Sequence, residues 1–430
     1  MDSRFTPEFQ RRTIARVSWR LLPLVVVAYL VAYIDRTNIA VAALTMNKDL
    51  GISASLYGIG AGIFFIGYAV FEIPSNMILE KVGARRWIAR IMVSWGIVSG
   101  FMALASGPAS FIALRLLLGI AEAGFFPGMI LYFTYWYPAA WRGRVISTLF
   151  IAVPVANAVA SVLSGAILGM DGMLGVKGWQ WVFIIESIPA VLLAFVVLRY
   201  LTDRPAVADW LDTDQKQWLE GELRAEREAV EAAGNPGAWQ VLKDPRVLAI
   251  SAIYFFSAAS NYGITFFLPQ IVKGLGASNF MAGMLSAIPY TVGVAGLLVF
   301  GYSSDRFMER RRHLITAATI GGAGFLLAAW LGGSYWALLG MSIATVGTYG
   351  SRPTMWPMPS RFLTGASAAV GIALINSIGN LGGYVGPFVV GWIRDATQSF
   401  GMGMFFLSWC AFMAALVAWL ARRATGAAAP

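Results

Sequence analysis

The chain alternates between long apolar runs and short polar stretches along its whole length. Runs of at least ~20 mostly apolar residues are long enough to cross ~30 Å of hydrocarbon as α-helix. Twelve such runs are predicted, at 21–46, 54–79, 87–106, 109–137, 145–170, 180–201, 246–273, 280–303, 313–333, 335–360, 365–393 and 401–421. The pattern predicts an all-α membrane protein with twelve transmembrane helices in two six-helix halves, 1–201 and 246–430, joined by a central loop at 202–245.

The composition supports lipid as the surroundings of this chain. Of its 430 residues 58% are hydrophobic and 13% are charged, against about 25% charged in an ordinary soluble domain. The formal charge of +10 suggests nucleic acid at first, but the basic residues flank apolar runs, so no nucleic-acid partner is expected. The single cysteine, Cys410, and single histidine, His313, exclude an intrachain disulfide and a His-based metal site, and no cofactor is expected.

The distribution of Lys and Arg predicts the orientation. An even number of spans places both termini on one side of the membrane, and basic residues favour the cytoplasmic side. The alternate loops that include the termini hold Arg4, Arg11, Arg12, Arg16, Arg20, Lys81, Arg85, Arg86, Arg90, Arg142, Arg144, Arg306, Arg310, Arg311, Arg312, Arg361, Arg422 and Arg423. The opposite loops hold Lys48, Lys177, Lys273 and Arg394. We therefore expect cytoplasmic termini and a location in the bacterial inner membrane.

The central loop contains one predicted helix. It starts at Thr213, a favourable N-cap, and runs through TDQKQWLEGELRAEREAVEAA with Trp218, Leu219 and Leu223 on one stripe. We interpret it as an amphipathic helix lying on a surface. A plain linker between the halves and a regulatory element are both consistent with this pattern.

Two loops carry a similar group of charges at equivalent places in the two halves. NMILEKVGARR follows the second span and GYSSDRFMERRR follows the eighth. Each has an acidic and a basic residue side by side, followed by an arginine cluster: Glu80, Lys81 and Arg85 in the first, Asp305 and Arg306 in the second. Such groups can latch neighbouring helices through charge pairs that open and re-form, and their repetition favours this over simple positive-inside anchoring.

These loops and the six-plus-six layout resemble the major facilitator superfamily. The fourth span, RLLLGIAEAGFFPGMILYFTYWYP, is similar to the signature of its anion:cation symporter family, which includes hexuronate, galactonate, tartrate and phthalate permeases. Further similar segments are YIDRTNIAVAAL, FFIGYAVFEIPSNMILEKVGARR, WQWVFIIESIPA, LTDRPAVADWL and ALINSIGNLGGYVGP. The resemblance covers nearly the whole chain. It implies transport of an organic anion together with protons.

Ionisable side chains inside the spans are functional candidates, because each costs roughly 2.5 to 3.5 kcal/mol at mid-bilayer. They are Asp35, Arg36, Glu72, Arg115, Glu122, Glu186 and Arg352. A rise of ~1.5 Å per residue places Glu122 near the centre, with Asp35 and Arg36 close to it. Arg115, Glu72 and Glu186 lie nearer the span ends and are interpreted as supporting charges. Asp35, Arg36 and Glu122 therefore form the core of any central site.

Asp35 and Arg36 are expected to have different roles. Arg36 can grip a carboxylate through two charge-assisted hydrogen bonds, although it can equally pair with an acid on a neighbouring helix. Asp35 lies ~100° round the helix from it, so one of the two faces the substrate and the other a neighbouring helix. The family resemblance implies that Asp35 and Glu122 are the proton-handling carboxylates.

Uncharged polar and aromatic residues gather at the same depth in both halves. This set consists of Tyr68, Asn157, Asn261, Trp356, Asn376 and Asn380. Buried amides can serve only to hold helices together, at about 0.6 kcal/mol each, and Tyr68 and Trp356 can be ordinary core or lipid-facing aromatics. Their common depth instead favours substrate binding in a polar cavity at the midplane.

Arg352 is the one membrane charge of the second half. It stands in YGSRPTMWPMPSRF, where Pro353, Pro357 and Pro359 remove helical donors and should bend or loosen the tenth span. One interpretation has Arg352 reaching toward the cytoplasm. The other has Arg36 and Arg352 holding the two ends of one dicarboxylate.

These features predict a secondary transporter that imports an organic carboxylate, such as tartrate, phthalate or a sugar acid, together with protons. We expect it to function as a monomer. An efflux antiporter of small organic compounds is the alternative within transport, and Arg36 and Arg352 oppose it. A membrane ligand sensor is a third possibility. No nucleophile–base pair or phosphate-binding glycine loop is found, so an enzyme is not expected.

Overall fold

The computed structural model describes residues 5–232, 241, 243–359, 362–363 and 365–422, without the side chains at 230, 231 and 365–369. Arg4, Arg361 and Arg423 of the charge pattern lie outside the described residues. The α-helices are α1 (Pro7–Thr37), α2 (Ile39–Asp49), α3 (Ala54–Val82), α4 (Ala84–Phe101), α5 (Pro108–Glu122), α6 (Phe125–Thr134), α7 (Ala139–Ile167), α8 (Gly178–Tyr200), α9 (Thr213–Ala232), α11 (Pro245–Gly274), α12 (Asn279–Arg306), α13 (Arg311–Trp330), α14 (Ala337–Met355), α15 (Gly365–Thr397) and α16 (Gly401–Leu420).

The predicted all-helical membrane fold is confirmed. Eleven spans within the described residues are long and apolar enough to cross a membrane. The tenth predicted span corresponds to α14, which is not among these eleven. Its second half carries Gly, Ser, Thr and Tyr residues and Arg352, so its mean hydropathy is low. α14 ends at Met355, and Pro357 and Pro359 lie beyond it, so these two prolines follow the helix instead of bending it.

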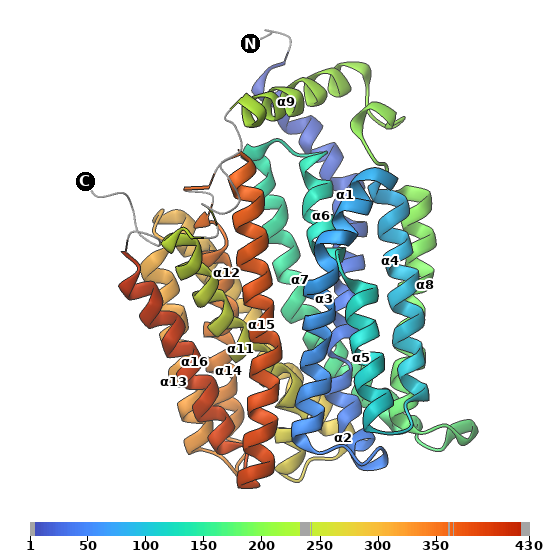
Figure 1. Ribbon diagram of the computed structural model, residues 1–430, viewed down its shortest axis with the longest axis vertical. Coiled ribbons are helices and arrows are strands. Elements are labelled where there is room, and N and C mark those ends of the chain that lie inside the picture. Colours follow the sequence, from blue (N-terminus) through green and yellow to red (C-terminus); the bar gives the residue numbers. More distant parts are fainter. Residues whose placement is uncertain (1–4, 233–240, 242, 360–361, 364, 423–430) are drawn as a thin grey trace.

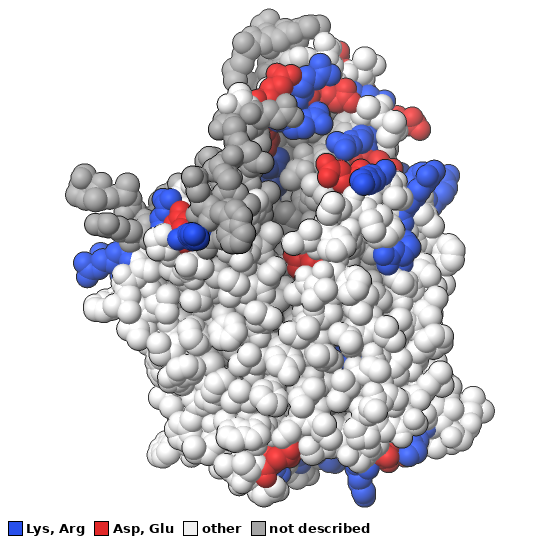
Figure 2. Space-filling view, viewed as in Figure 1, with Lys and Arg blue, Asp and Glu red and all other residues white. Residues whose placement is uncertain are grey.

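The helices form two groups side by side (Figure 1). Helices α1 to α8 make up one group and α11 to α16 the other. α1 begins and α16 ends at the same end of the bundle, which we call the terminal end; the other is the distal end. Lys and Arg side chains are numerous at the terminal end, with a smaller charged group at the distal end, and the surface between is almost free of charge (Figure 2). This uncharged band is what a membrane-spanning surface requires.

The two groups pack closely toward the distal end. α3 runs along α15, and α7 runs along α12. A Cβ atom at Gly391 of α15 would lie 2.2 Å from the carbonyl oxygen of Ala54, and one at Gly283 of α12 would lie 2.4 Å from that of Ser161. Only glycine fits at such approaches, which is typical of membrane helix pairs. The halves are therefore in contact through backbone at this end.

Two predicted spans differ from the observed helices. α1 begins at Pro7 instead of near 21, because the Thr6 side chain caps it by accepting a hydrogen bond from Phe9 N at 3.3 Å. The fourth span is not one helix: α5 ends at Glu122, Gly124 adopts a left-handed conformation (φ 84°, ψ −1°), and α6 follows. A Cβ atom at Gly124 would lie 2.3 Å from Ser75 Oγ, so the break also lets α3 approach.

The predicted amphipathic helix of the central loop is present as α9. Trp218, Leu219 and Leu223 are buried, and the Trp218 ring packs edge-on against Phe9 at 6.4 Å between centroids. The preceding loop is tied to α1 by an ion pair from Arg16 Nη1 to Asp212 Oδ2 at 2.9 Å. α9 lies across the terminal end of α1 (Figure 1). Trp218 of the stripe is therefore covered by Phe9 of the first half, and α9 also contacts α15 of the second half.

Candidate functional site

A small cavity lies between the two halves, and we call it the central cavity. Nine of its thirteen lining residues are aromatic, and the other four are two arginines and two asparagines: Tyr29, Tyr33, Arg36, Phe65, Tyr68, Phe126, Phe150, Tyr254, Tyr262, Arg352, Trp356, Asn376 and Asn380. Its free volume is about 30 Å³. That is room for one or two water molecules and not for an organic acid, so the site is nearly closed in this state.

Six of the eight predicted substrate-binding residues line the central cavity: Arg36, Tyr68, Arg352, Trp356, Asn376 and Asn380. The remaining two, Asn157 and Asn261, are buried outside it. Asn157 Nδ2 donates to Tyr349 Oη at 2.7 Å, which joins α7 to α14. This contact fits the alternative of an amide that holds helices together, and substrate contact by Asn157 and Asn261 stays a prediction.

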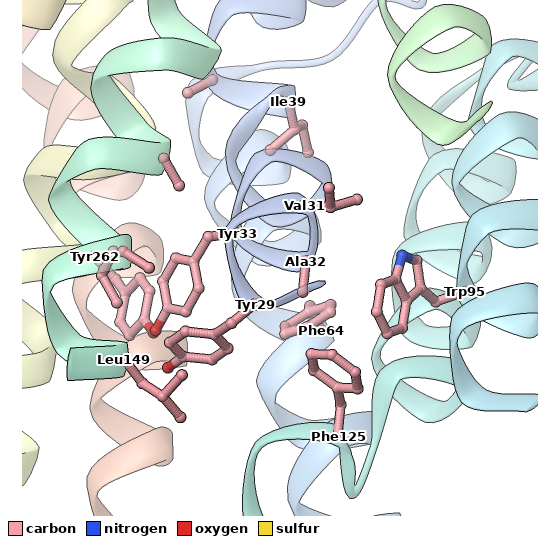
Figure 3. Close-up of a cluster of buried hydrophobic side chains, with 14 of the residues drawn as sticks. Tyr29, Val31, Ala32, Tyr33, Ile39, Phe64, Trp95, Phe125, Leu149 and Tyr262 are labelled. Carbon is pink, nitrogen blue, oxygen red and sulfur yellow. The ribbon is translucent and has the colours of Figure 1, made fainter. Parts of the chain in front are cut away.

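Sequence reasoning missed most of the aromatic lining. Tyr29 and Tyr33 extend from α1 toward Tyr262 of α11 (Figure 3), and the Tyr33 and Tyr262 hydroxyl oxygens are 3.3 Å apart. Tyr29, Tyr33 and Arg36 are spaced i, i+4 and i+7, so they share one helix face. That spacing was the available signal, because it places two tyrosines beside the candidate anion ligand.

Arg36 and Glu122 form a buried ion pair that joins α1 to α5. Arg36 Nη2 donates to Glu122 Oε1, and the two side chains are 8% and 0% exposed. Among the described residues, Arg36 Nε and Glu122 Oε2 have no hydrogen-bond partner. The Arg36 guanidinium also lies over the Tyr33 ring, 4.7 Å from its centroid. Arg36 thus lines the cavity and also pairs with an acid on a neighbouring helix, which was the second of the two roles considered for it from the sequence.

Asp35 faces the opposite way. Its Oδ2 accepts a hydrogen bond from Trp95 Nε1 at 3.0 Å and its Oδ1 accepts one from Ser99 Oγ at 2.9 Å, both on α4. Trp95 lies on the side of α1 away from Tyr33 and Tyr262 (Figure 3). Asp35 is 1% exposed and does not line the central cavity. The two neighbours on α1 therefore point in different directions, as the 100° step predicts.

Arg352 differs from the other membrane arginines. Its guanidinium lies over the Tyr349 ring, 5.4 Å from the centroid, and its side chain lines the central cavity. No acidic side chain within the described part of the chain forms an ion pair with it. Because the charge of Arg36 is balanced by Glu122, Arg352 leaves the cavity with an uncompensated positive charge. A guanidinium placed in this way can bind a carboxylate through two charge-assisted hydrogen bonds.

Glu72 connects the two halves at the edge of this cavity. Asn376 Nδ2 of α15 donates to Glu72 Oε1 at 2.9 Å and to Glu72 Oε2 at 3.0 Å. Glu72 is 4% exposed. Asn376 therefore both lines the cavity and binds an acid of the opposite half. A substrate that takes a hydrogen bond from Asn376 would compete with this contact between the halves.

The remaining two membrane charges are held inside the first half. Arg115 donates from Nε to Gly60 O at 3.2 Å and from Nη2 to Ala61 O at 3.3 Å, so it braces α5 against α3. Glu186 of α8 accepts from Ser164 Oγ of α7 at 2.7 Å. Neither lines the central cavity. Their positions agree with supporting charges.

The predicted latch loops make no charge pair between helices in this state. Asp305 pairs with Arg310 of the same loop, and Arg306 Nη1 donates to Tyr302 Oη at 3.3 Å. Neighbours such as Asp305 and Arg306, or Glu80 and Lys81, diverge by ~100° on a helix and cannot pair with each other. In the first loop, Arg85 uses its backbone N to donate to Asp203 Oδ1 at 2.8 Å. The expected latch pairs are thus not formed among the described residues.

The described residues contain no group of three or more His, Cys, Asp or Glu side chains that could hold a metal ion. The arrangement can instead bind an anion between two arginines and move a proton on a carboxylate beside one of them.

Comparisons with known proteins identify membrane transporters as the relatives of this chain. The family model described as Major Facilitator Superfamily matches residues 25–387. A protein of Agrobacterium vitis, named provisionally as a tartrate transporter, is 45% identical over 410 residues, which cover 95% of this chain and 94% of the relative. A quinolone resistance transporter of Acinetobacter baumannii is 44% identical over 402 residues, covering 93% of each chain. Among solved structures, a bacterial homolog of the human lysosomal transporter Spinster superposes with a TM-score of 0.75 at 20% identity, covering 99% of this chain and 100% of that one.

Proposed function

The chain belongs to the major facilitator superfamily, and from this premise we propose that it imports an organic carboxylate together with protons. The substrate class is a dicarboxylate such as tartrate or phthalate, or a sugar acid. The observation that carries the proposal is the uncompensated charge of Arg352 in a cavity that Arg36 enters from the other half. An anion with two negative groups would satisfy both guanidinium groups at once.

The pairing of Arg36 with Glu122 supports a simple form of coupling. A substrate carboxylate and the Glu122 carboxylate compete for the same guanidinium. A proton on Glu122 removes its negative charge, weakens the ion pair and frees Arg36 for the substrate. Substrate and proton therefore bind together. Asp35 is the second proposed proton carrier, and its bonds to Trp95 and Ser99 would change on protonation and act on α1 next to Arg36.

Alternating access follows from movement of the two halves about this cavity. In the present state the halves meet at the distal end along α3 with α15 and α7 with α12. We propose that these contacts separate when the distal end opens. The loops that contain Glu80 and Asp305 then hold the terminal end closed. A single chain is the proposed functional unit.

A second candidate is an efflux antiporter of small organic compounds. The Acinetobacter baumannii relative, whose name refers to quinolone resistance, favours it. The positive cavity opposes it for cationic compounds, since Arg352 would repel them.

A counterflow experiment separates these candidates. Proteoliposomes loaded with one unlabelled compound from a panel of tartrate, phthalate, sugar acids, hydroxyphenylacetate and a quinolone would receive a trace of the same labelled compound. Counterflow is driven by the loaded compound and needs no pH gradient, so it identifies the substrate class independently of proton coupling. We expect exchange with a carboxylate of the first four types. Exchange of the quinolone alone would replace the import proposal with the efflux one.

The orientation is tested separately by cysteine labelling. In a Cys410→Ala background, Glu228→Cys of α9 should be shielded from an impermeant thiol reagent added to intact cells, because we place the terminal end in the cytoplasm. Met173→Cys, an exposed position at the distal end, should be labelled. Labelling of position 228 without permeabilisation would reverse the proposed orientation.

A further inference from the structure

A second, larger cavity opens at the distal end of the bundle. Its volume is about 870 Å³, which falls within the range of small-molecule binding sites. Residues of both halves line it, from α2 on one side and from α11, α15 and the neighbouring loops on the other. In the same state the central cavity offers only about 30 Å³. An organic acid therefore fits the distal cavity and not the central one.

Three basic residues line this cavity: Lys48 of α2, Lys273 of α11 and Arg394 of α15. None of them forms an ion pair with any residue that the structure describes. Arg394 Nη1 is closed off from solvent without a hydrogen-bond partner, and the guanidinium lies over the Phe400 ring, 5.0 Å from its centroid. Three positive side chains thus line the cavity without an ion-pair partner in the described part of the chain.

The nearby acids are engaged elsewhere. Asp395, the one acidic lining residue, accepts hydrogen bonds from Ala54 N at 3.1 Å and from Ser55 N at 2.8 Å at the start of α3. Asp49, next to Lys48 in the chain, binds Lys177 Nζ at 3.1 Å and Trp179 Nε1 at 2.9 Å. Asp49 is thus paired with a lysine outside the cavity lining, whereas Asp395 offsets one of the three cations. The lining therefore holds three positive charges against the one negative charge of Asp395, a net charge of +2.

We propose that this cavity is a docking site for small multivalent anions, and that the transported carboxylate occupies it on its way to the central cavity. The identity of this ligand rests on the proposed function, whereas anion binding itself does not. A cavity with an excess of one sign of charge concentrates the opposite ion and raises its rate of arrival by tenfold or more. The site thus selects anions before they reach Arg36 and Arg352.

The test measures the charge preference of a reporter thiol and needs no transport. In a Cys410→Ala background, Ser399→Cys places a thiol in the lining of the distal cavity, and Met173→Cys serves as a reference at the same end. Both react with an anionic and a cationic methanethiosulfonate reagent of similar size. At low ionic strength we expect the anionic-to-cationic rate ratio at position 399 to exceed that at 173 by about tenfold.

Substitutions then assign the effect. Replacing Lys48, Lys273 and Arg394 together by glutamine should lower the anionic-to-cationic rate ratio at position 399 to the value at position 173. The control is Lys177→Gln, which removes a paired lysine at the same end and should leave the ratio at 399 unchanged. Tartrate and sulfate should each slow labelling at 399 where chloride at equal ionic strength does not, and stronger protection by tartrate would mark a carboxylate site. Equal ratios at 399 and 173, or no protection by either dianion, would overturn the proposal. If tartrate protects the thiol at position 399 but no carboxylate exchanges in the counterflow experiment, the proposed transport function would be contradicted and the anion site would not.

Discussion

Uptake driven by a pH gradient should be lost in Glu122→Gln and in Asp35→Asn proteins, because an amide cannot carry the proton. For Glu122→Gln we also expect substrate binding to persist and to lose its dependence on pH. The glutamine no longer draws the Arg36 guanidinium away from the cavity, so protonation is not needed to free it. In the wild-type protein, substrate binding should strengthen as pH falls, until the substrate itself becomes protonated. Binding to purified protein and uptake in proteoliposomes measure the two effects.

Asp35→Asn has an additional structural effect. An asparagine offers one acceptor oxygen where Asp35 accepts from both Trp95 and Ser99. One buried donor is left without a partner, at a cost of about 1 to 3 kcal/mol in stability. Thermal stability must therefore be measured for this variant, and Glu8→Gln, a change at an exposed acid, is the matched control. Wild-type accumulation against a gradient by both variants would show that neither residue carries the coupled proton.

Arg352→Ala should weaken dicarboxylate binding at least tenfold. Truncating one partner of a buried charge pair costs about 2 to 5 kcal/mol, and about 1.4 kcal/mol corresponds to a factor of ten. Folding should change little, because within the described residues Arg352 holds no acid whose charge would be left unpaired. The affinity loss should be much smaller for a monocarboxylate of the same shape, such as benzoate against phthalate, if one carboxylate binds Arg36 and the other Arg352.

The control for this change is Arg144→Ala, which removes an exposed arginine at the terminal end and should leave affinity unchanged. The affinity of the true substrate should be measured by titration of purified protein. An unchanged value in Arg352→Ala would remove Arg352 from the site. The dicarboxylate preference would then lose its basis as well.

The charged residues of the site could be predicted from the sequence because charged side chains are rare within membrane-spanning helices. An arginine or carboxylate among apolar residues is costly in lipid, so Arg36, Glu122 and Arg352 stand out without any structure. The aromatic lining gives no such contrast. Tyr254 and Phe150 line the central cavity, yet in the sequence they look like any aromatic residue of an apolar helix. Only the packing of the two halves separates them from the core.

Contacts between residues that are far apart in the chain could not be predicted from the sequence either. Arg36 and Glu122 are 86 positions apart, and a helix pattern gives the depth of each but not which neighbour it meets. The break at Gly124 was hidden for a similar reason. Glycine and alanine in EAGFFPG fit a continuous helix as well as an interrupted one, and it is the approach of Ser75 from α3 that suits a residue without a side chain.

In the transport cycle proposed above, carboxylate and proton move together through one cavity. This joint movement is tested most directly by uptake into proteoliposomes under an imposed pH gradient, acidic outside, with a pH-sensitive dye trapped inside. The substrate identified by counterflow should accumulate above its external concentration, and its addition should speed acidification of the interior. Both effects should vanish in Glu122→Gln. Uptake that only equilibrates, with no movement of protons when the substrate is added, would contradict the account.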